Sequence, residues 1–445
     1  MGLRFASNEV AKGLSARGGR SLKPVRHAQR RRARIRGFGY FKRLGPGFVT
    51  GAADDDPSGV GTYSQVGAAY GFGLLWSTLA VAPMAAVVQE TAARLGVTTE
   101  KGLATLIKER FPRWVLYVAV ALTVIANTFN IGADIRSMAA AANLVVPVPT
   151  LLLVVILTSI MLGLELALPY RRYSLVLRWL ALSLLTYVIV LAMVHVDWGA
   201  VAKDTFVPRL VGGSAGFAAL VAVFGTTVSP YLFFWQASEE VEEEIEHHTL
   251  GAPVSSDQIR GMRVDVLGGM ASAVFVAFCI MVAAAVTLHA KGITTIETAQ
   301  QAAQALEPAA GRLAEFVFAV GIVGLGLLAV PVLAGATGYA LSQAFGWNEG
   351  LSRTIRQAPG FYLTLAGSML LGLVLTFVAV SPIQGLYYAA ILNGLAAPPL
   401  ILLLFLLSRS RAVLGKWRSG ALATTFLVVT MVASVVVPLG ALLAS

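Results

Sequence analysis

The chain has 445 residues, of which 57% are hydrophobic and only 13% are charged, and its mean hydropathy is +0.74. An ordinary soluble domain carries about twice that charged fraction. The apolar residues occur in runs of roughly 18 or more, which is the length needed to cross about 30 Å of hydrocarbon. These numbers exclude an ordinary soluble domain and predict an all-α, polytopic protein of the lipid bilayer. The single cysteine, Cys279, excludes an intramolecular disulfide.

Residues 1–43 form a basic tail, with its densest part in RHAQRRRARIR, Arg26 to Arg36. No apolar run follows soon enough for a signal peptide. We interpret the segment as a cytoplasmic tail that contacts anionic lipid. The net charge of +11 at pH 7 therefore does not indicate nucleic acid, and no nucleic-acid partner is expected. No protein partner is predicted.

About eleven apolar spans follow the tail. They cover residues 46–71, 73–95, 114–142, 150–168, 174–196, 214–238, 264–289, 313–345, 360–380, 384–408 and 421–443. The eighth span contains Pro331 and several glycines, so we expect a kink or a shorter helix there.

Lysine and arginine residues gather in alternate loops, on the same side as the basic tail: 101–113, 171–172, 353–356 and 409–418. The positive-inside rule places this side, with the N-terminus, in the cytoplasm of the cell membrane, and eleven spans place the C-terminus outside. The acidic segment Glu239 to His248 then lies on the cytoplasmic face. It is either a solvated helix end or a vestibule that concentrates cations. Glu90 and Glu165 lie near span ends and are expected to be solvated.

Three consecutive carboxylates, Asp54, Asp55 and Asp56, lie near the middle of the first span and directly precede Pro57. Proline removes a backbone donor and disfavours helix at the residue before it, so the first helix is expected to be broken here. Irregular backbone at membrane depth is tolerated where it lines a cavity, and oxygen ligands suit a hard divalent cation. We predict Asp56 as the main ligand, with Asp55 and Asp54 as direct or indirect partners. The alternative is a loop outside the membrane.

The sixth span has a second mid-span proline, in FGTTVSPYLFFWQ, Phe224 to Gln236. Interrupted helices at corresponding positions of two halves indicate a substrate site at the membrane midplane. Five spans per half is an odd number, so the halves are inverted. We therefore divide the chain into the tail, a first repeat at 44–212, a second repeat at 213–410 and an appended eleventh span at 411–445.

These residues resemble the Nramp family of divalent-metal transporters, which has the LeuT-type five-plus-five inverted repeat. The family's Asp-Pro-Gly-Asn motif matches DPSG, Asp56 to Gly59, and its Ala-x-x-Met-Pro-His motif aligns with TTVSPY, Thr226 to Tyr231. The resemblance covers roughly residues 44–440 and implies that Gly59, Thr226 and Ser229 belong to the metal site.

The chain departs from the family pattern at three site positions. Where the family has an asparagine, a metal-binding methionine and a histidine, this chain has Gly59, Ser229 and Tyr231. Loss of a soft thioether leaves only hard oxygen donors, which favour magnesium over softer metals. The pattern is similar to the Nramp-related magnesium transporter branch.

The third span carries one carboxylate, Asp134, where the resemblance implies two, because the other position is Ile131. The five histidines are predicted to lie in tails, loops or span ends: His27, His195, His247, His248 and His289. We therefore expect transport that is not coupled to protons, although Asp134 could pair with a cation from another span. In the tenth span, Asn393 either completes the metal shell or hydrogen-bonds a neighbouring helix.

The sequence thus predicts a transporter that moves Mg²⁺ and Mn²⁺ by alternating access, with the metal as its substrate and no cofactor. One alternative is a proton-coupled manganese or iron transporter of the ordinary Nramp type. Two others are a membrane enzyme with an aspartate-bound magnesium and a channel. The enzyme would need a second aspartate-rich motif, which the spans lack.

Overall fold

The computed structural model describes residues 45–167, 185–377 and 381–443, and every regular element in these ranges is a helix. The predicted basic tail at 1–43, Arg171, Arg172 and much of the predicted fifth span lie outside the described residues. The long helices are α2 (Pro46–Asp54), α3 (Pro57–Tyr70), α4 (Trp76–Thr99), α6 (Arg113–Asn143), α7 (Thr150–Ala167), α9 (Leu185–Met193), α11 (Gly213–Thr227), α12 (Pro230–Glu246), α13 (Ser256–Thr287), α16 (Ala314–Phe345), α17 (Pro359–Leu375), α18 (Pro382–Arg409) and α20 (Ala421–Leu443).

Most predicted spans match these helices closely, and two differences have simple causes. Helix α12 continues to Glu246, through the acidic segment, because Glu is a good helix former. Helix α13 begins at Ser256, whose preceding residue Ser255 caps the helix with its side chain. Helix α16 is continuous through Pro331, so the expectation of a shorter helix is wrong.

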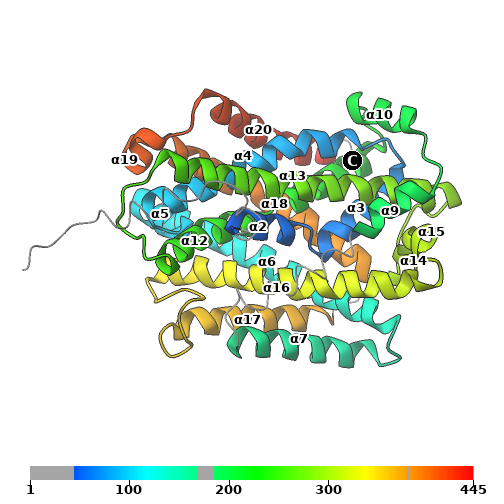
Figure 1. Ribbon diagram of the computed structural model, residues 1–445, viewed down its shortest axis with the longest axis horizontal. Helices are drawn as coiled ribbons and strands as arrows, with labels where there is room; N and C mark the ends of the chain where they lie inside the picture. The colour runs from blue at the N-terminus through cyan, green and yellow to red at the C-terminus, as the bar shows by residue number, and fades with distance from the viewer. Residues whose placement is uncertain (1–44, 168–184, 378–380, 444–445) are drawn as a thin grey trace, which may run out of the picture. The chain divides into compact units, whose positions relative to one another are not determined.

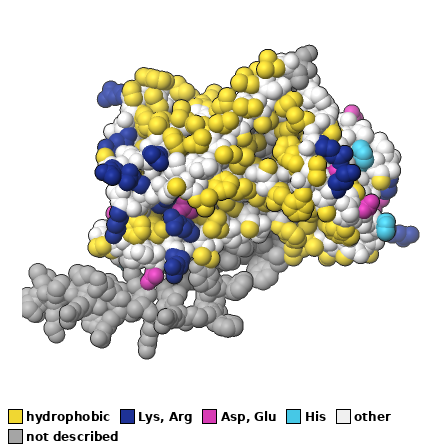
Figure 2. All heavy atoms as spheres, turned by 90° about the horizontal axis from the view of Figure 1, so that it is seen from above, with side chains coloured by type: hydrophobic (Ala, Val, Ile, Leu, Met, Phe, Trp, Pro, Cys, Tyr) yellow, Lys and Arg dark blue, Asp and Glu magenta, His cyan; other side chains and the backbone are white. Residues whose placement is uncertain are grey.

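By length and hydropathy, seven helical stretches of the described chain could each cross a membrane. Helix α17 is apolar but shorter, and the first predicted span is divided between α2 and α3. On the face shown in Figure 2, hydrophobic side chains cover the middle of the molecule and Lys and Arg gather toward its two ends. The chain is a multi-pass membrane protein.

The helices pack in two groups (Figure 1). Helices α6, α7, α16 and α17, which correspond to spans three, four, eight and nine, contact one another. Helices α2, α3, α4, α11, α12 and α13, which correspond to spans one, two, six and seven, form the other group. Helix α18 contacts both groups through α3 and α6, and α20 packs on α11 and α18. Spans at corresponding positions of the two halves, such as one and six or three and eight, therefore lie in the same group.

The loops 101–113 and 409–418, both rich in Lys and Arg, lie together at one end of these helices. Arg110 of α5 (Leu103–Arg110) donates a hydrogen bond to the carbonyl of Ala412 in α19 (Arg411–Leu414), over 2.9 Å. Lys108 donates to the carbonyl of Gln343 at the end of α16. Figure 1 shows α5 and α19 at this end and α10 (Trp198–Phe206), α14 (Ala299–Ala303) and α15 (Glu307–Ala310) at the other.

Candidate functional site

The first span is broken at the predicted place. Helix α2 ends at Asp54, α3 begins at Pro57, and Asp55 and Asp56 between them are not helical. Pro57 occupies the first helical position of α3, where its missing N–H costs nothing. Asp56 is the N-cap residue, and its carboxylate accepts a hydrogen bond from the Gly59 N–H, the usual capping arrangement.

The sixth span is broken in the same way. Helix α11 ends at Thr227 and α12 begins at Pro230, with Val228 and Ser229 between them. The Ser229 hydroxyl lies 2.9 Å from the Gly225 carbonyl and 2.8 Å from the Thr226 carbonyl. It therefore satisfies carbonyls that the end of α11 leaves without partners. The prediction of paired broken helices is confirmed.

All three aspartates of the first break are buried. The exposed fractions of Asp54, Asp55 and Asp56 are 2%, 7% and 2%, so the alternative of a solvent-exposed loop is wrong. Within the described ranges, none of the three forms an ion pair with Lys, Arg or His. Isolated buried charges are expensive, so this region favours a bound cation.

Neutral donors surround the Asp56 carboxylate on both oxygens. Oδ1 accepts from the Ser58 hydroxyl (2.6 Å) and the Gly59 N–H (2.8 Å). Oδ2 accepts from Asn130 Nδ2 (3.1 Å), and the Tyr231 hydroxyl lies 3.5 Å away. The same Tyr231 hydroxyl is 3.1 Å from the carbonyl of Ala53, in the last turn of α2. Asp56 thus joins both broken helices and α6.

Most of the other predicted ligands lie around this carboxylate. The Thr226 hydroxyl oxygen is 3.4 Å from the Ser58 hydroxyl oxygen. A Cβ added at Gly59 would lie 3.6 Å from the same Thr226 oxygen. The carbonyl ends of α2 and α11 also point to this region, and such ends carry partial negative charge. The break therefore gathers carboxylate, hydroxyl and carbonyl oxygens: Thr226 and Tyr231 bring hydroxyls close to Ser58 and Asp56, Gly59 donates its N–H to Asp56, and the Ser229 hydroxyl bonds the end of α11.

Asn393 is not joined to the site by any hydrogen bond within the described residues. It is fully buried on α18, yet neither its Nδ2 nor its Oδ1 has a hydrogen-bond partner there. Of the two alternatives for Asn393, the bond to a neighbouring helix is not found among the described residues, and the place in the metal shell stays a prediction. Its neighbour Gly394 packs against the backbone of Gly225 on α11, so α18 does approach the second break.

Asp134 is buried on α6 close to the site, and both of its oxygens lack a regular hydrogen bond. Its carboxylate faces the Ser58 backbone and lies within electrostatic reach of Asp56. No Lys, Arg or His in the described part of the chain pairs with it, so the predicted cation from another span is not found. Sequence reasoning missed Asn130, one helical turn before Asp134. The polar i, i+4 spacing on an apolar helix was the available signal.

The acidic residues predicted to be solvated are largely buried. Glu90 is 7% exposed because it binds Arg263 (2.7 Å) and Arg94 (3.1 Å). Glu165 is 4% exposed. In the acidic segment, Glu240 is 4% exposed and accepts from Gln236 (2.8 Å), so a fully solvated helix end is also wrong.

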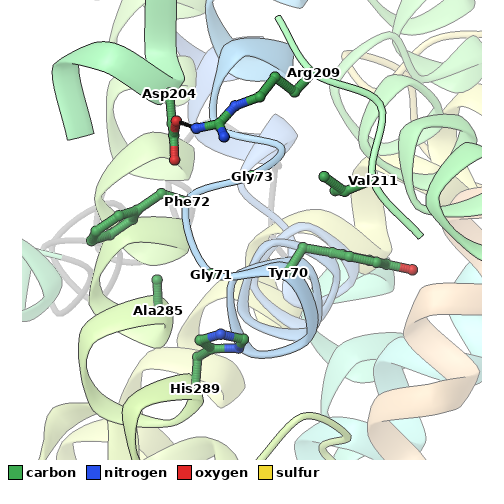
Figure 3. A pocket seen from close by; sticks show the side chains of 9 residues that line it. All are labelled: Tyr70, Gly71, Phe72, Gly73, Asp204, Arg209, Val211, Ala285 and His289. Atoms are coloured by element: carbon green, nitrogen blue, oxygen red, sulfur yellow. Dashed lines mark ion pairs between the residues drawn. The ribbon is translucent and has the colours of Figure 1, made fainter. Parts of the chain in front are cut away.

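A separate cavity of about 310 Å³ lies beyond the far end of α3 (Figure 3). It is lined by Tyr70, His289 and an ion pair between Asp204 and Arg209. His289 donates from Nδ1 to the Ala68 carbonyl over 2.7 Å, which ties α13 to α3. None of the aspartates of the break lines this cavity. The ion pair already balances its charge, so it does not compete with the break as a cation site.

Among the residues that the structure describes, no three His, Cys, Asp or Glu side chains converge as a metal centre would require. Side chains of Asn130, Ser58, Thr226 and Tyr231 lie around Asp56 and offer further oxygen atoms. Weakly held, partly hydrated cations fit such a site better than tightly chelated ones.

Two broken helices that meet at buried carboxylates, in a chain whose two halves form an inverted repeat, define a LeuT-type transporter fold. Solved structures support this assignment. A manganese transporter of Eremococcus coleocola superposes with a TM-score of 0.76 at 18% identity, covering 92% of this chain and 87% of that one. MhsT, solved in complex with L-phenylalanine, gives a TM-score of 0.59 at 12% identity and covers 89% and 97%.

The chain belongs to the Nramp family, because the family model described as natural resistance-associated macrophage protein-like matches residues 47–444. A protein of Yersinia pestis named divalent metal cation transporter MntH is 30% identical over 337 residues, 73% of this chain and 78% of its own length. A protein of the same name from Pectobacterium carotovorum is 29% identical over 337 residues, with the same coverage.

Proposed function

We propose that this protein carries divalent cations, Mg²⁺ and Mn²⁺, across the cell membrane by alternating access and without proton entry. The observation that carries the proposal is the Asp56 carboxylate, buried at the first helix break among neutral oxygen and amide groups. Names of the relatives as metal cation transporters support divalent metal transport and give no support to an enzyme.

The absence of sulfur and imidazole from the site supports the choice of ion. Ser229 and Tyr231 occupy the positions where the family resemblance implies methionine and histidine, and both present oxygen. Oxygen donors suit Mg²⁺ and Mn²⁺, and soft metals gain little from them. The donors that already occupy both Asp56 oxygens favour an ion that retains part of its water, as Mg²⁺ prefers.

Transport without protons is supported by where the histidines lie. The four described histidines, His195, His247, His248 and His289, are in loops or at helix ends. The membrane potential alone favours divalent cation entry, by about 2.3 kcal/mol per charge per 100 mV. The basic loops at one end support an orientation with the N-terminus in the cytoplasm and the C-terminus outside.

Uptake into proteoliposomes tests the proposal, with a pH-sensitive dye sealed inside. We expect Mg²⁺ and Mn²⁺ to enter and compete with each other while the internal pH stays constant. Asp56→Ala should lower uptake by more than about 100-fold, since removing one partner of a buried charge pair costs about 3–5 kcal/mol. An Asp257→Ala variant, changed at the exposed start of α13, is the control and should transport normally.

Retained uptake in Asp56→Ala would contradict the site. Acidification that scales with metal uptake and disappears in Asp134→Asn would instead support the proton-coupled alternative. That alternative is favoured by one observation, the buried Asp134 carboxylate without a regular hydrogen bond.

A further inference from the structure

A continuous polar stripe runs along α6. Its members are spaced at i, i+4, i+7, i+11 and i+14, so they share one helix face. Each is no more than 1% exposed: Thr123, Asn127, Asn130, Asp134 and Ser137. A buried polar stripe on a helix within a membrane protein is costly unless its groups are satisfied, and it is typically functional.

The unsatisfied atoms of this stripe are all acceptors. Asn130 Oδ1 has no hydrogen-bond partner among the described residues, and both oxygens of Asp134 lack a regular one. Each buried acceptor without a partner costs about 1–3 kcal/mol. Asn127 Oδ1 also lacks a partner, but its Nδ2 donates to the Leu333 carbonyl and the Thr337 hydroxyl, so this amide faces α16.

Asn130 faces the break. Its Nδ2 lies 3.1 Å from Asp56 Oδ2, which sets the orientation of the amide, because the reverse orientation would place two acceptor oxygens together. Rotation about the Cβ–Cγ bond exchanges Nδ2 and Oδ1. The same side chain can therefore donate to Asp56 or offer an oxygen to a cation held at Asp56.

The charge balance favours a cation over water as the group that satisfies these acceptors. Asp54, Asp55, Asp56 and Asp134 are all buried, and no described cationic side chain pairs with any of them. Water would satisfy hydrogen bonds and leave the charges uncompensated. A divalent cation supplies two positive charges and accepts amide and carboxylate oxygens as ligands.

From these contacts we propose that Asn130 binds the transported cation through its side-chain oxygen, and that Asp134, one turn further along α6, supplies the second negative charge beside Asp56. The cation site then extends from the break toward α6. This inference rests on the proposed function, because it assigns ligands for the same ion.

Binding of Mn²⁺ to the purified protein, followed by electron paramagnetic resonance, tests the inference together with Mg²⁺ uptake. Asn130→Ala should raise the Kd for Mn²⁺ by about tenfold or more. Asn130→Asp should bind Mn²⁺ more tightly than Asn130→Ala, because it keeps an oxygen ligand and adds charge. Asp134→Asn should also weaken binding by about tenfold.

Which of the two Asn130 variants binds Mn²⁺ more tightly shows whether Asn130 is a metal ligand or only positions Asp56. If Asn130 serves only to donate to Asp56, the added carboxylate repels Asp56, and Asn130→Asp must then bind more weakly than Asn130→Ala. That result, or unchanged Mn²⁺ affinity in Asn130→Ala, would overturn the assignment of Asn130. Unchanged affinity in Asp134→Asn would overturn the assignment of Asp134.

Asn127→Ala is the matched control. It removes an amide of the same stripe that bonds α16, so it should lower thermal stability and leave the Kd for Mn²⁺ within about twofold. Asn130→Ser replaces Asn130→Ala if that variant does not fold. Persistent Mn²⁺ binding and uptake in Asp56→Ala would be a failure of the proposed function itself, which is separate from the outcome at Asn130.

Discussion

The Asp265 carboxylate on α13 accepts a hydrogen bond of 2.7 Å from the backbone N–H of Gly47, in the first turn of α2. The N–H of Gly45 lies 3.3 Å from the other carboxylate oxygen. Asp265 therefore caps a helix other than its own. A Cβ at Gly47 would lie 2.6 Å from the Val266 backbone nitrogen, so the two helices are also in close contact. At its other end, α13 is followed by His289, which is bonded to α3. One continuous helix thus holds both halves of the broken first span.

Asp265→Ala should loosen α2, the first half of that span. Loss of a cap costs about 0.5–2 kcal/mol, so α2 should detach from α13 more often. In a Cys279→Ala background with a cysteine at Ala53, we expect faster labelling by a thiol reagent when Asp265 is replaced. Asp257→Ala, on the same helix but away from α2, is the control. Equal labelling rates in both variants would show that the cap does not hold α2 closed.

Gly225→Ala should strongly destabilise the packing of α11 on α18. An added Cβ would overlap the carbonyl of Ala390 and the backbone nitrogen of Gly394, and backbone atoms cannot move aside easily. We expect a loss of about 1–3 kcal/mol or more, seen as a lower Tm in a thermal-shift assay. Gly163→Ala, where an added Cβ has no neighbour within 4 Å, is the control and should not lower the Tm.

Ser229→Met should move selectivity toward softer metals. The thioether would enter the break between α11 and α12 and would favour metals such as Zn²⁺ over Mg²⁺. We expect Zn²⁺ to compete with Mg²⁺ uptake about tenfold better, equivalent to about 1.4 kcal/mol. Ser229→Leu has a similar volume without sulfur and should not show this gain. The same gain in Ser229→Leu would mean that size, and not sulfur, determines selectivity.

Stability should fall with rising pH because of Glu349, between α16 and α17. Burial raises the pKa of this carboxyl from its ordinary 4.5 to about 8, against the opposing effects of the Gln343 hydrogen bond and Arg353. A raised pKa means that the folded state holds the proton more tightly than the unfolded state. Its stabilising contribution is complete below about pH 4.5 and is lost as the pH rises through about 8.

The measurement compares the Tm of the wild type with that of Glu349→Gln, which keeps a neutral group beside Gln343. The Tm of the wild type should fall relative to the variant between about pH 5 and about pH 9. Glu297→Gln, changed at an exposed position, is the control. A constant difference across this range would contradict the assignment of Glu349.

The sequence by itself determined the spans and the two breaks. The length of each span follows from the thickness of the hydrocarbon layer, which is a signal of composition. The two breaks follow from Pro57 and Pro230, which act on the backbone next to them, so this signal is local. Burial of the aspartates at the first break followed from the same pattern. The resemblance carried by DPSG and TTVSPY reached the family, which the match to residues 47–444 shows.

Only the tertiary structure decided which side chains meet at the break. Asn130 reaches Asp56 across 74 residues of chain, and Arg263 buries Glu90 across 173. The pattern of apolar and polar residues in a span indicates which residues face the protein interior. It does not indicate which helix lies opposite them or how that helix is rotated about its own axis. For that reason Glu90 and Glu165 were wrongly expected to be solvated, and the sequence left two alternatives open for Asn393.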